Sequence, residues 1–119
     1  MITSWDAMPD QVTRFLYIAQ LSIPKELEER FAELYDREHI PSLMQVPGVH
    51  SCVRHRLVWS DSEQMPEYLA VYEVDHADVP KSDAWQTASN HGDWVTEIRP
   101  HLTVRRHGVF EKIREFVPR

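Results

Sequence analysis

The chain has 119 residues, a formal net charge of −6 at pH 7, one cysteine and three glycines. This length suits one domain with a modest core, and the acidic balance, with no basic run longer than Arg105-Arg106, argues against nucleic-acid binding. One cysteine permits no internal disulfide, and no apolar run approaches the ~20 residues of a membrane span. We therefore expect a soluble, cytoplasmic protein with an N-terminal extension over residues 1–12 and a single domain over residues 13–119.

The first half of the chain predicts a strand, a long helix and a second strand. Residues 14–22 are rich in aromatic and β-branched side chains and end before Pro24, which suits the first turn of a helix. An amphipathic helix is expected from residue 24 to about residue 45, with a break near Pro41 because proline lacks the backbone N–H. Pro47-Gly48 predicts a turn, and a strand over residues 49–59 comes after it.

The second half predicts a strand, a weaker helix and a last strand. Residues 67–74 should form a hairpin with the strand before them. A helix is expected over residues 80–99, weakened at residues 90–93 because a glycine such as Gly92 costs about 1 kcal/mol in a helix interior. Residues 102–113 then form the fourth strand. The order β-α-β-β-α-β predicts an α+β, ferredoxin-like protomer: a four-stranded antiparallel sheet with two helices on one face.

Both faces of this sheet are expected to be apolar. The strand at residues 14–22 presents Tyr17, Ala19 and Leu21 on one side and Leu16 and Ile18 on the other. Two helices can cover only one face, and closed two-fold homodimers are the commonest oligomers. A homodimer, with a barrel formed between two sheets, is therefore the expected assembly.

The strand at residues 49–59 is expected to point one set of side chains at the helices and another away from them. The first set is Val49, Ser51, Val53 and Leu57, and the second is His50, Cys52, Arg54 and Arg56. Arg54 and Arg56 would then bind a carboxylate of the substrate or pair with Glu73 or Glu111. Cys52 is expected to be a small buried hydrophobe.

The run Tyr35-Asp36-Arg37-Glu38-His39-Ile40-Pro41 is the best candidate for chemistry. Helical spacing places Glu38 on the apolar stripe of Leu27, Phe31 and Leu34, so its carboxylate should have a raised pKa or be held ionised by hydrogen-bond donors. His39 would act as a base near its ordinary pKa of about 6.5. The structural alternative is that Glu38 hydrogen-bonds to free backbone groups and Tyr35 packs by its ring.

The seven histidines show no H-x-x-x-H or H-E-x-x-H spacing, so no metal site is expected. His76 or His91 could ligate haem, but neither lies in a haem motif. No glycine-rich phosphate loop occurs, and no cofactor is expected.

These residues resemble a known family. Tyr35-Asp36-x-Glu38-His39-Ile40-Pro41, followed by Val46-Pro47-Gly48-Val49 and later by PEYLAVYE at residues 66–73, is similar to the EthD-like branch of the dimeric α+β barrel superfamily. The resemblance covers roughly residues 15–113. It implies a ferredoxin-like protomer, a homodimer, and a small-molecule cavity between sheet and helices. The superfamily includes cofactor-free monooxygenases, polyketide cyclases, lactone isomerases, dehydratases and haem-handling enzymes.

We expect an enzyme that acts on a small aromatic or polyketide-like molecule by cofactor-independent acid/base chemistry, such as cyclisation, dehydration or isomerisation. The expected catalytic residues are His39, Glu38 and Tyr35, and the expected substrate-binding residues are Tyr17, Arg54, Tyr72 and His107. One alternative is a cofactor-free, EthD-like monooxygenase, which oxygen consumption would distinguish. The other is a non-catalytic ligand-binding module, favoured if backbone groups satisfy Glu38 and no cavity reaches His39.

Overall fold

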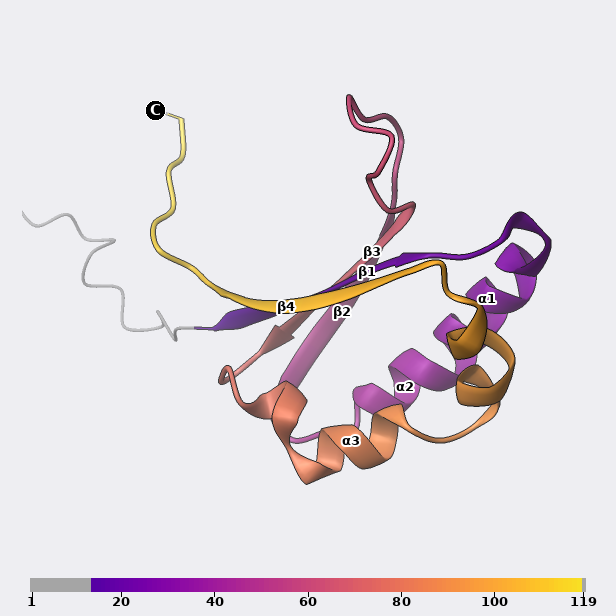
Figure 1. Ribbon diagram of the computed structural model, residues 1–119. Coiled ribbons are helices and arrows are strands. Elements are labelled where there is room, and N and C mark those ends of the chain that lie inside the picture. The colour runs from indigo at the N-terminus through magenta and orange to yellow at the C-terminus, as the bar shows by residue number, and fades with distance from the viewer. Residues whose placement is uncertain (1–13, 119) are drawn as a thin grey trace, which may run out of the picture.

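The computed structural model describes residues 14–118, so the expected extension over residues 1–12 lies outside the described residues. Four strands, β1 (Phe15–Ser22), β2 (Val49–Arg56), β3 (Tyr68–Val74) and β4 (Val104–Glu111), form one antiparallel sheet in the order β2-β3-β1-β4. All the helical segments lie on one side of this sheet (Figure 1). The predicted ferredoxin-like α+β arrangement is confirmed. Within the described residues, no helix is both long and apolar enough to cross a membrane.

The first helical segment is disturbed where Pro41 predicts it, but it does not break. It runs through η2 (Lys25–Leu27), α1 (Glu28–Leu34), the π-helix η3 (Tyr35–His39) and α2 (Ile40–Leu43). The Ile40 N–H donates to the Tyr35 carbonyl, five residues back. In an α-helix, the ring of Pro41 would press on the carbonyl four residues earlier. The wider π turn accommodates the proline, and the helix continues beyond it.

The second helical segment consists of short pieces: η4 (Val79–Lys81), α3 (Asp83–Ser89), the π-helix η5 (Trp94–Ile98) and η6 (Arg99–His101). The hydroxyl of Ser82 caps α3 by accepting from the Trp85 N–H at 3.1 Å. The weak point expected at residues 90–93 is a complete interruption, with Gly92 at φ +87°. The second π turn also lies just before a proline, Pro100, and its closing bond runs from the Arg99 N–H to the Trp94 carbonyl.

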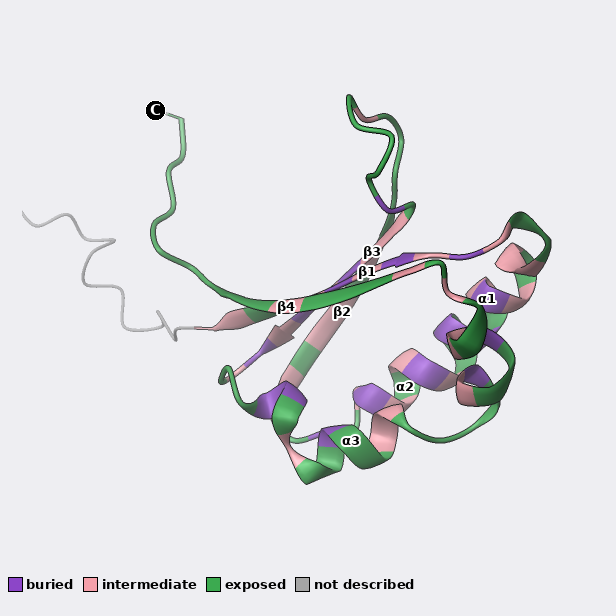
Figure 2. Cartoon of the chain, in the orientation of Figure 1, coloured by how far each residue is buried: buried purple, intermediate pink, exposed green. Residues whose placement is uncertain are grey.

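The alternation predicted for β1 and β3 is confirmed. Their inward side chains form the centre of the core, as the buried residues of the sheet show (Figure 2). This inward set is Ala19, Leu21, Ala70, Tyr72 and Val74, packed against Phe31, Leu34, Leu43 and Ile98 from the helices. The opposite face carries Leu16, Ile18 and Val71, and no helix of the described residues covers it.

The facing predicted for β2 is wrong after its first residue. Val49 lies opposite Val74, but the register shifts between Val49 and Ser51, so that Cys52 lies opposite Tyr72. This irregularity inserts one residue and exchanges the two faces of the strand. Cys52 and Arg54 therefore point towards the helices, whereas Val53 lies on the open face and is 52% exposed.

The two helical segments are joined where their π turns meet. Glu38 Oε1 accepts a hydrogen bond of 2.6 Å from the backbone N–H of Trp94, the first residue of η5. A Cβ atom on Gly92 would lie 2.6 Å from the carboxyl carbon of Glu38, so only glycine fits beneath this carboxylate. Nearby, Arg30 donates to both carboxylate oxygens of Glu97 at 2.9 Å. A side chain of the first helical segment thus binds the backbone of the second and fixes its position.

Gly92→Ala is expected to lower the free energy of unfolding by about 1–3 kcal/mol, because alanine is strained at positive φ and its methyl group would displace Glu38 from Trp94. Denaturant unfolding measures this loss. Thr87→Ala, at an exposed position of α3 away from Glu38, is the control and should leave the free energy of unfolding almost unchanged. Equal stability of the two variants would contradict this account of Gly92.

Candidate functional site

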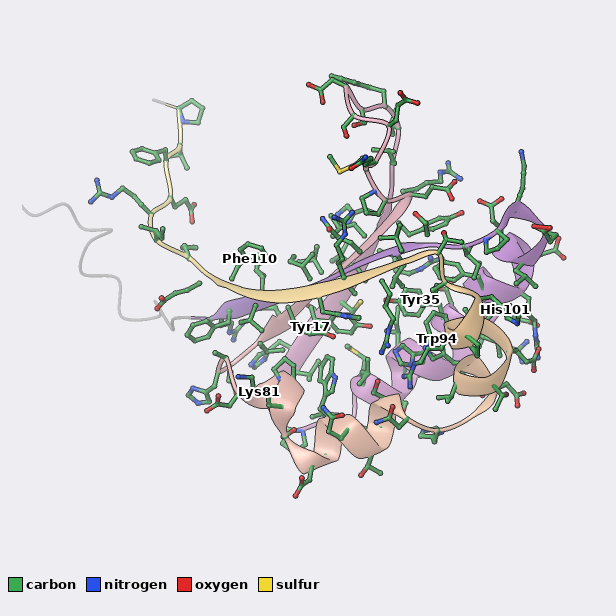
Figure 3. The ribbon with its side chains drawn as sticks, viewed as in Figure 1. Tyr17, Tyr35, Lys81, Trp94, His101 and Phe110 are labelled. Carbon is green, nitrogen blue, oxygen red and sulfur yellow. The ribbon has the colours of Figure 1, made fainter. Side chains whose placement is uncertain are left out.

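A small cavity lies between the sheet and the helices, in the layer where Figure 3 shows Tyr17, Tyr35 and Trp94. Its volume is about 40 Å³. That is enough for a few water molecules or a small acyl group, and well below the ~300 Å³ of a pocket for a drug-sized ligand. The lining consists of Tyr17, Ala19, Leu21, Tyr35, His39, Leu43, Tyr72, Trp85, Ser89, Trp94, Arg99, Leu102, Arg105 and His107.

His39 reaches this cavity because of the π turn. The turn places Tyr35, His39 and Leu43 in the buried stripe at intervals of four residues. The indole of Trp94 lies parallel to the His39 ring at 4.7 Å and parallel to the Tyr35 ring at 4.7 Å. The imidazole is therefore a packed part of the core, with 8% of its surface exposed.

The His39 imidazole lies in a cationic and poorly solvated environment. Burial lowers its pKa to about 3, and the nearby positive charges of Arg99 and Arg105, with His91 and His107, act in the same direction. Its Nδ1 atom is buried and has no hydrogen-bond partner within residues 14–118. His39 is thus neutral at pH 7, as a base must be. The expected ordinary pKa of about 6.5 is wrong.

Three tyrosines line the same space, and their hydroxyls are protonated. Burial raises the pKa of Tyr17 to about 12, and it raises the pKa values of Tyr35 and Tyr72 well above their usual range. Tyr17 meets Tyr72 and Trp85 edge-on, with ring centroids 5.6 Å and 4.8 Å away. At neutral pH these phenols remain hydrogen-bond donors.

The edge strand β4 contributes Arg105 and His107 to the cavity lining. Arg105 and His107 alternate along this strand, face inward opposite Leu21 and Ala19, and are exposed at the rim. The His107 ring stacks on Tyr17 at 5.6 Å. Burial and the positive charges of Arg105 and Arg99 lower the pKa of His107.

The structure brings together Tyr35, His39, Tyr17, Tyr72 and His107 from the predicted set, but it leaves Glu38 and Arg54 outside the cavity lining. Glu38 accepts from the backbone of Trp94 instead, and the expectation that it lines the cavity is wrong. Because of the π turn, His39 rather than Glu38 faces the cavity.

Arg54 lies over the Phe31 and Tyr35 rings and pairs with Asp36 at 2.7 Å. Its partner is therefore neither Glu73 nor Glu111, and Arg14 takes Glu73 instead. Burial raises the pKa of Cys52 to about 11, so this thiol is protonated at neutral pH. Among the described residues, no group of three or more His, Cys, Asp and Glu side chains is arranged to hold a metal ion.

Five polar or aromatic residues of the cavity lining were not predicted as site residues: Trp85, Ser89, Trp94, Arg99 and Arg105. No sequence motif marks Trp85, Trp94 or Ser89 as part of a site. Arg99 lies between the π turn Trp94–Ile98 and Pro100. The proline that comes soon after this helical segment is the one sequence cue that could have indicated its position. Their convergence depends on tertiary packing.

No protein-family model matches the chain, and no curated protein sequence matches it. An ethyl tert-butyl ether d (EthD) family protein of Bacillus halodurans is 20% identical, with a TM-score of 0.61 over 84% of this chain and 99% of that protein. A candidate antibiotic biosynthesis monooxygenase of Bordetella bronchiseptica is 19% identical, with a TM-score of 0.63 over 87% of this chain and 99% of that one.

A dimeric ferredoxin-like protein from an uncultured marine organism is 18% identical, with a TM-score of 0.61 over 90% of this chain and 94% of that protein. This chain shares their fold. At these identities the likeness concerns the fold alone, and it confirms the ferredoxin-like α+β fold that the sequence resemblance implies.

The pKa of His39 predicts how the stability of the protein depends on pH. An unfolded chain protonates His39 near pH 6.5, whereas the folded chain does so at about 3. Between these values the unfolded state binds the extra proton, so His39 lowers the free energy of unfolding as the pH falls. His39→Phe removes this contribution, and denaturant unfolding of both proteins across the window measures it. An imidazole NMR signal of His39 that titrates near pH 6.5 would contradict the prediction.

Proposed function

We propose that the protein is an enzyme that moves a proton on a small carbonyl compound without a cofactor, with His39 as the base. The observation that carries this proposal is a buried imidazole whose Nδ1 has no partner within residues 14–118 and whose ring lines a cavity together with three tyrosine side chains. Enolisation is the shared first step of the isomerisation, cyclisation and dehydration expected from the sequence. Because the cavity is about 40 Å³, the proposal concerns a small acyl or keto group and leaves a polyketide ring system aside.

Each lining group has a role that its protonation state allows. The neutral His39 ring accepts a proton from the carbon next to the carbonyl. Tyr17, Tyr35 and Tyr72 remain protonated and donate to the oxygen on which negative charge develops. Trp94 holds the imidazole ring in place by stacking on it. The positive charge of Arg99 and Arg105 favours the enolate over the neutral ketone.

The two alternatives differ in the fate of the bound molecule. A cofactor-free monooxygenase would pass the enolate to molecular oxygen, and oxygen consumption with stoichiometric substrate loss would identify it. A binding module would leave the ligand unchanged. One condition for such a module is a Glu38 fully hydrogen-bonded by backbone, and the bond from Trp94 to Oε1 meets it in part. The cavity beside His39 fails the other condition, which is why we favour the enzyme.

The test is the solvent exchange of carbon-bound protons. We expect the full-length protein to accelerate loss of the pyruvate methyl proton signal in deuterium oxide. His39→Phe should reduce this rate to that of buffer, since phenylalanine keeps the aromatic stack with Trp94 but has no nitrogen. Alanine would be a poorer choice, because His39 is buried and its removal would leave a cavity.

His101→Phe is the control, since His101 lies at the edge of the helical layer and is exposed (Figure 3). It should exchange pyruvate protons at the unmodified rate. Exchange that survives in His39→Phe would remove His39 from the mechanism. The absence of catalysed exchange with pyruvate, 2-oxobutanoate and acetylacetone alike would leave the binding module as the function.

We also propose that a second copy of the chain covers the open face of the sheet, as the dimeric ferredoxin-like relatives suggest. Val53, Val71, Ile18 and Gly108 form one apolar row across the four strands on that face. Phe110 beside this row is 59% exposed and lies on the side away from the helices (Figure 3). The loop at residues 57–67 and the tail at residues 112–118 lie on the same side (Figure 1). Their exposed Trp59, Ile113 and Phe116 would extend the contact.

Sedimentation at micromolar concentration should give a dimer. Val71→Asp should give a monomer, because the two-fold axis would bring its buried carboxylate near a second one. Thr87→Asp, an exposed change on the helical layer, is the control and should remain dimeric. A stable monomer in the unmodified protein would contradict the proposal, since large exposed apolar patches are rare on monomers.

A further inference from the structure

The cavity is positively charged, although the protein as a whole is acidic. The chain has 19 Asp and Glu residues against 13 Lys and Arg, yet no Asp or Glu occurs in the lining among the described residues. The lining includes two guanidinium groups, Arg99 and Arg105. Neither has a carboxylate partner in the described part of the chain. Two cations thus meet at one cavity without a counter-ion.

Arg99 is fixed by neutral groups at the C-terminal end of α3, from Ser89 and the C-cap residue Asn90. Its Nη1 donates to Asn90 Oδ1 at 2.7 Å, and its Nη2 donates to the Ser89 carbonyl at 2.6 Å. Its Nε atom is buried and unpartnered within residues 14–118. These contacts position the guanidinium but leave its charge uncompensated. Arg105 faces the same cavity from β4, opposite Leu21.

His39 is the second, independent indication of a missing polar partner. Its side chain is more than nine-tenths buried, and its Nδ1 has no partner in the described residues. Buried polar groups without partners are rare, because each costs free energy in the folded state. A ligand that accepts from the guanidinium groups and presents a hydrogen to the imidazole nitrogen would satisfy both.

We propose that the substrate of this cavity is a small carboxylate, whose charged oxygens lie between Arg99 and Arg105 and whose reacting carbon lies next to His39. This inference rests on the proposed function and specifies its substrate class as 2-oxo or 3-oxo acids. Guanidinium groups bind carboxylates by charge-assisted hydrogen bonds, often in pairs. The tyrosines remain available for the keto oxygen.

Carboxylate binding would also improve His39 as a base. Burial and the charges of Arg99, Arg105 and His107 hold the imidazole neutral, with His91 contributing nearby. A negative charge offsets these cations and favours protonation, so the pKa of His39 rises when the carboxylate binds. A base works best when its pKa is near the working pH. The substrate's own charge would thus help its deprotonation.

The binding test compares acetate with its uncharged isostere, acetamide. We expect acetate to shift the His39 ring signals saturably and to raise the pH at which they titrate, and acetamide to bind at least about tenfold more weakly. Arg105→Met should weaken acetate by about tenfold, which corresponds to the loss of one charged contact. Arg106→Met is the matched control, because Arg106 is the adjacent residue on the opposite face of β4 and contacts Gln64. It should leave acetate binding unchanged.

Acetamide that binds as tightly as acetate, or equal losses in the Arg105 and Arg106 variants, would overturn the proposal. Inorganic phosphate that binds more tightly than acetate would overturn it in favour of a phosphorylated ligand. The proton exchange of pyruvate and of uncharged pyruvamide separates this inference from the proposed function. Equal exchange of pyruvate and pyruvamide protons refutes the carboxylate as the recognised group and supports His39 as the base. Acetate binding without exchange of pyruvate protons refutes the base and supports the carboxylate.

Discussion

The site depends on two π turns, each of which lies just before a proline. Pro41 comes after η3 and Pro100 comes after η5, and in both cases the N–H of the residue before the proline donates to a carbonyl five residues back. A proline inside an α-helix clashes with the preceding turn, and a wider turn relieves this without ending the helix. The widened turns carry Tyr35, His39 and Trp94, whose rings stack on one another with interplanar angles of 13° to 25°.

The same turns link the two helical segments. Glu38 belongs to the first π turn, and its carboxylate accepts from the N–H that opens the second. A free N–H at the start of a helix requires an acceptor, and the positive end of the helix favours a carboxylate. Gly92 is needed beneath that carboxylate because no side chain fits there. A few residues with no contact to the cavity therefore determine where Trp94 lies.

The fold was predictable wherever the side-chain period was undisturbed. The alternation of β1 and β3 locates Tyr17 and Tyr72 on the helical face, because the strand period of two holds along both strands. The irregularity near Ser51 exchanges the two faces of β2. The π turn places His39, rather than Glu38, in the buried stripe. Neither has a reliable signal in one sequence, since both arise when tertiary packing competes with local regularity. Arg99 and Arg105 meet only after η6 and β4 have packed.

Glu38 and His39 are neighbours in sequence with opposite environments, and the chemistry depends on that separation. A carboxylate beside an imidazole favours the imidazolium form and would hold His39 protonated over a wider pH range. The π turn instead directs Glu38 to the backbone of η5, and His39 faces a cavity with cations and phenols. The imidazole thus remains neutral at pH 7. The bound molecule supplies the negative charge that raises the pKa of His39 and makes it a stronger base.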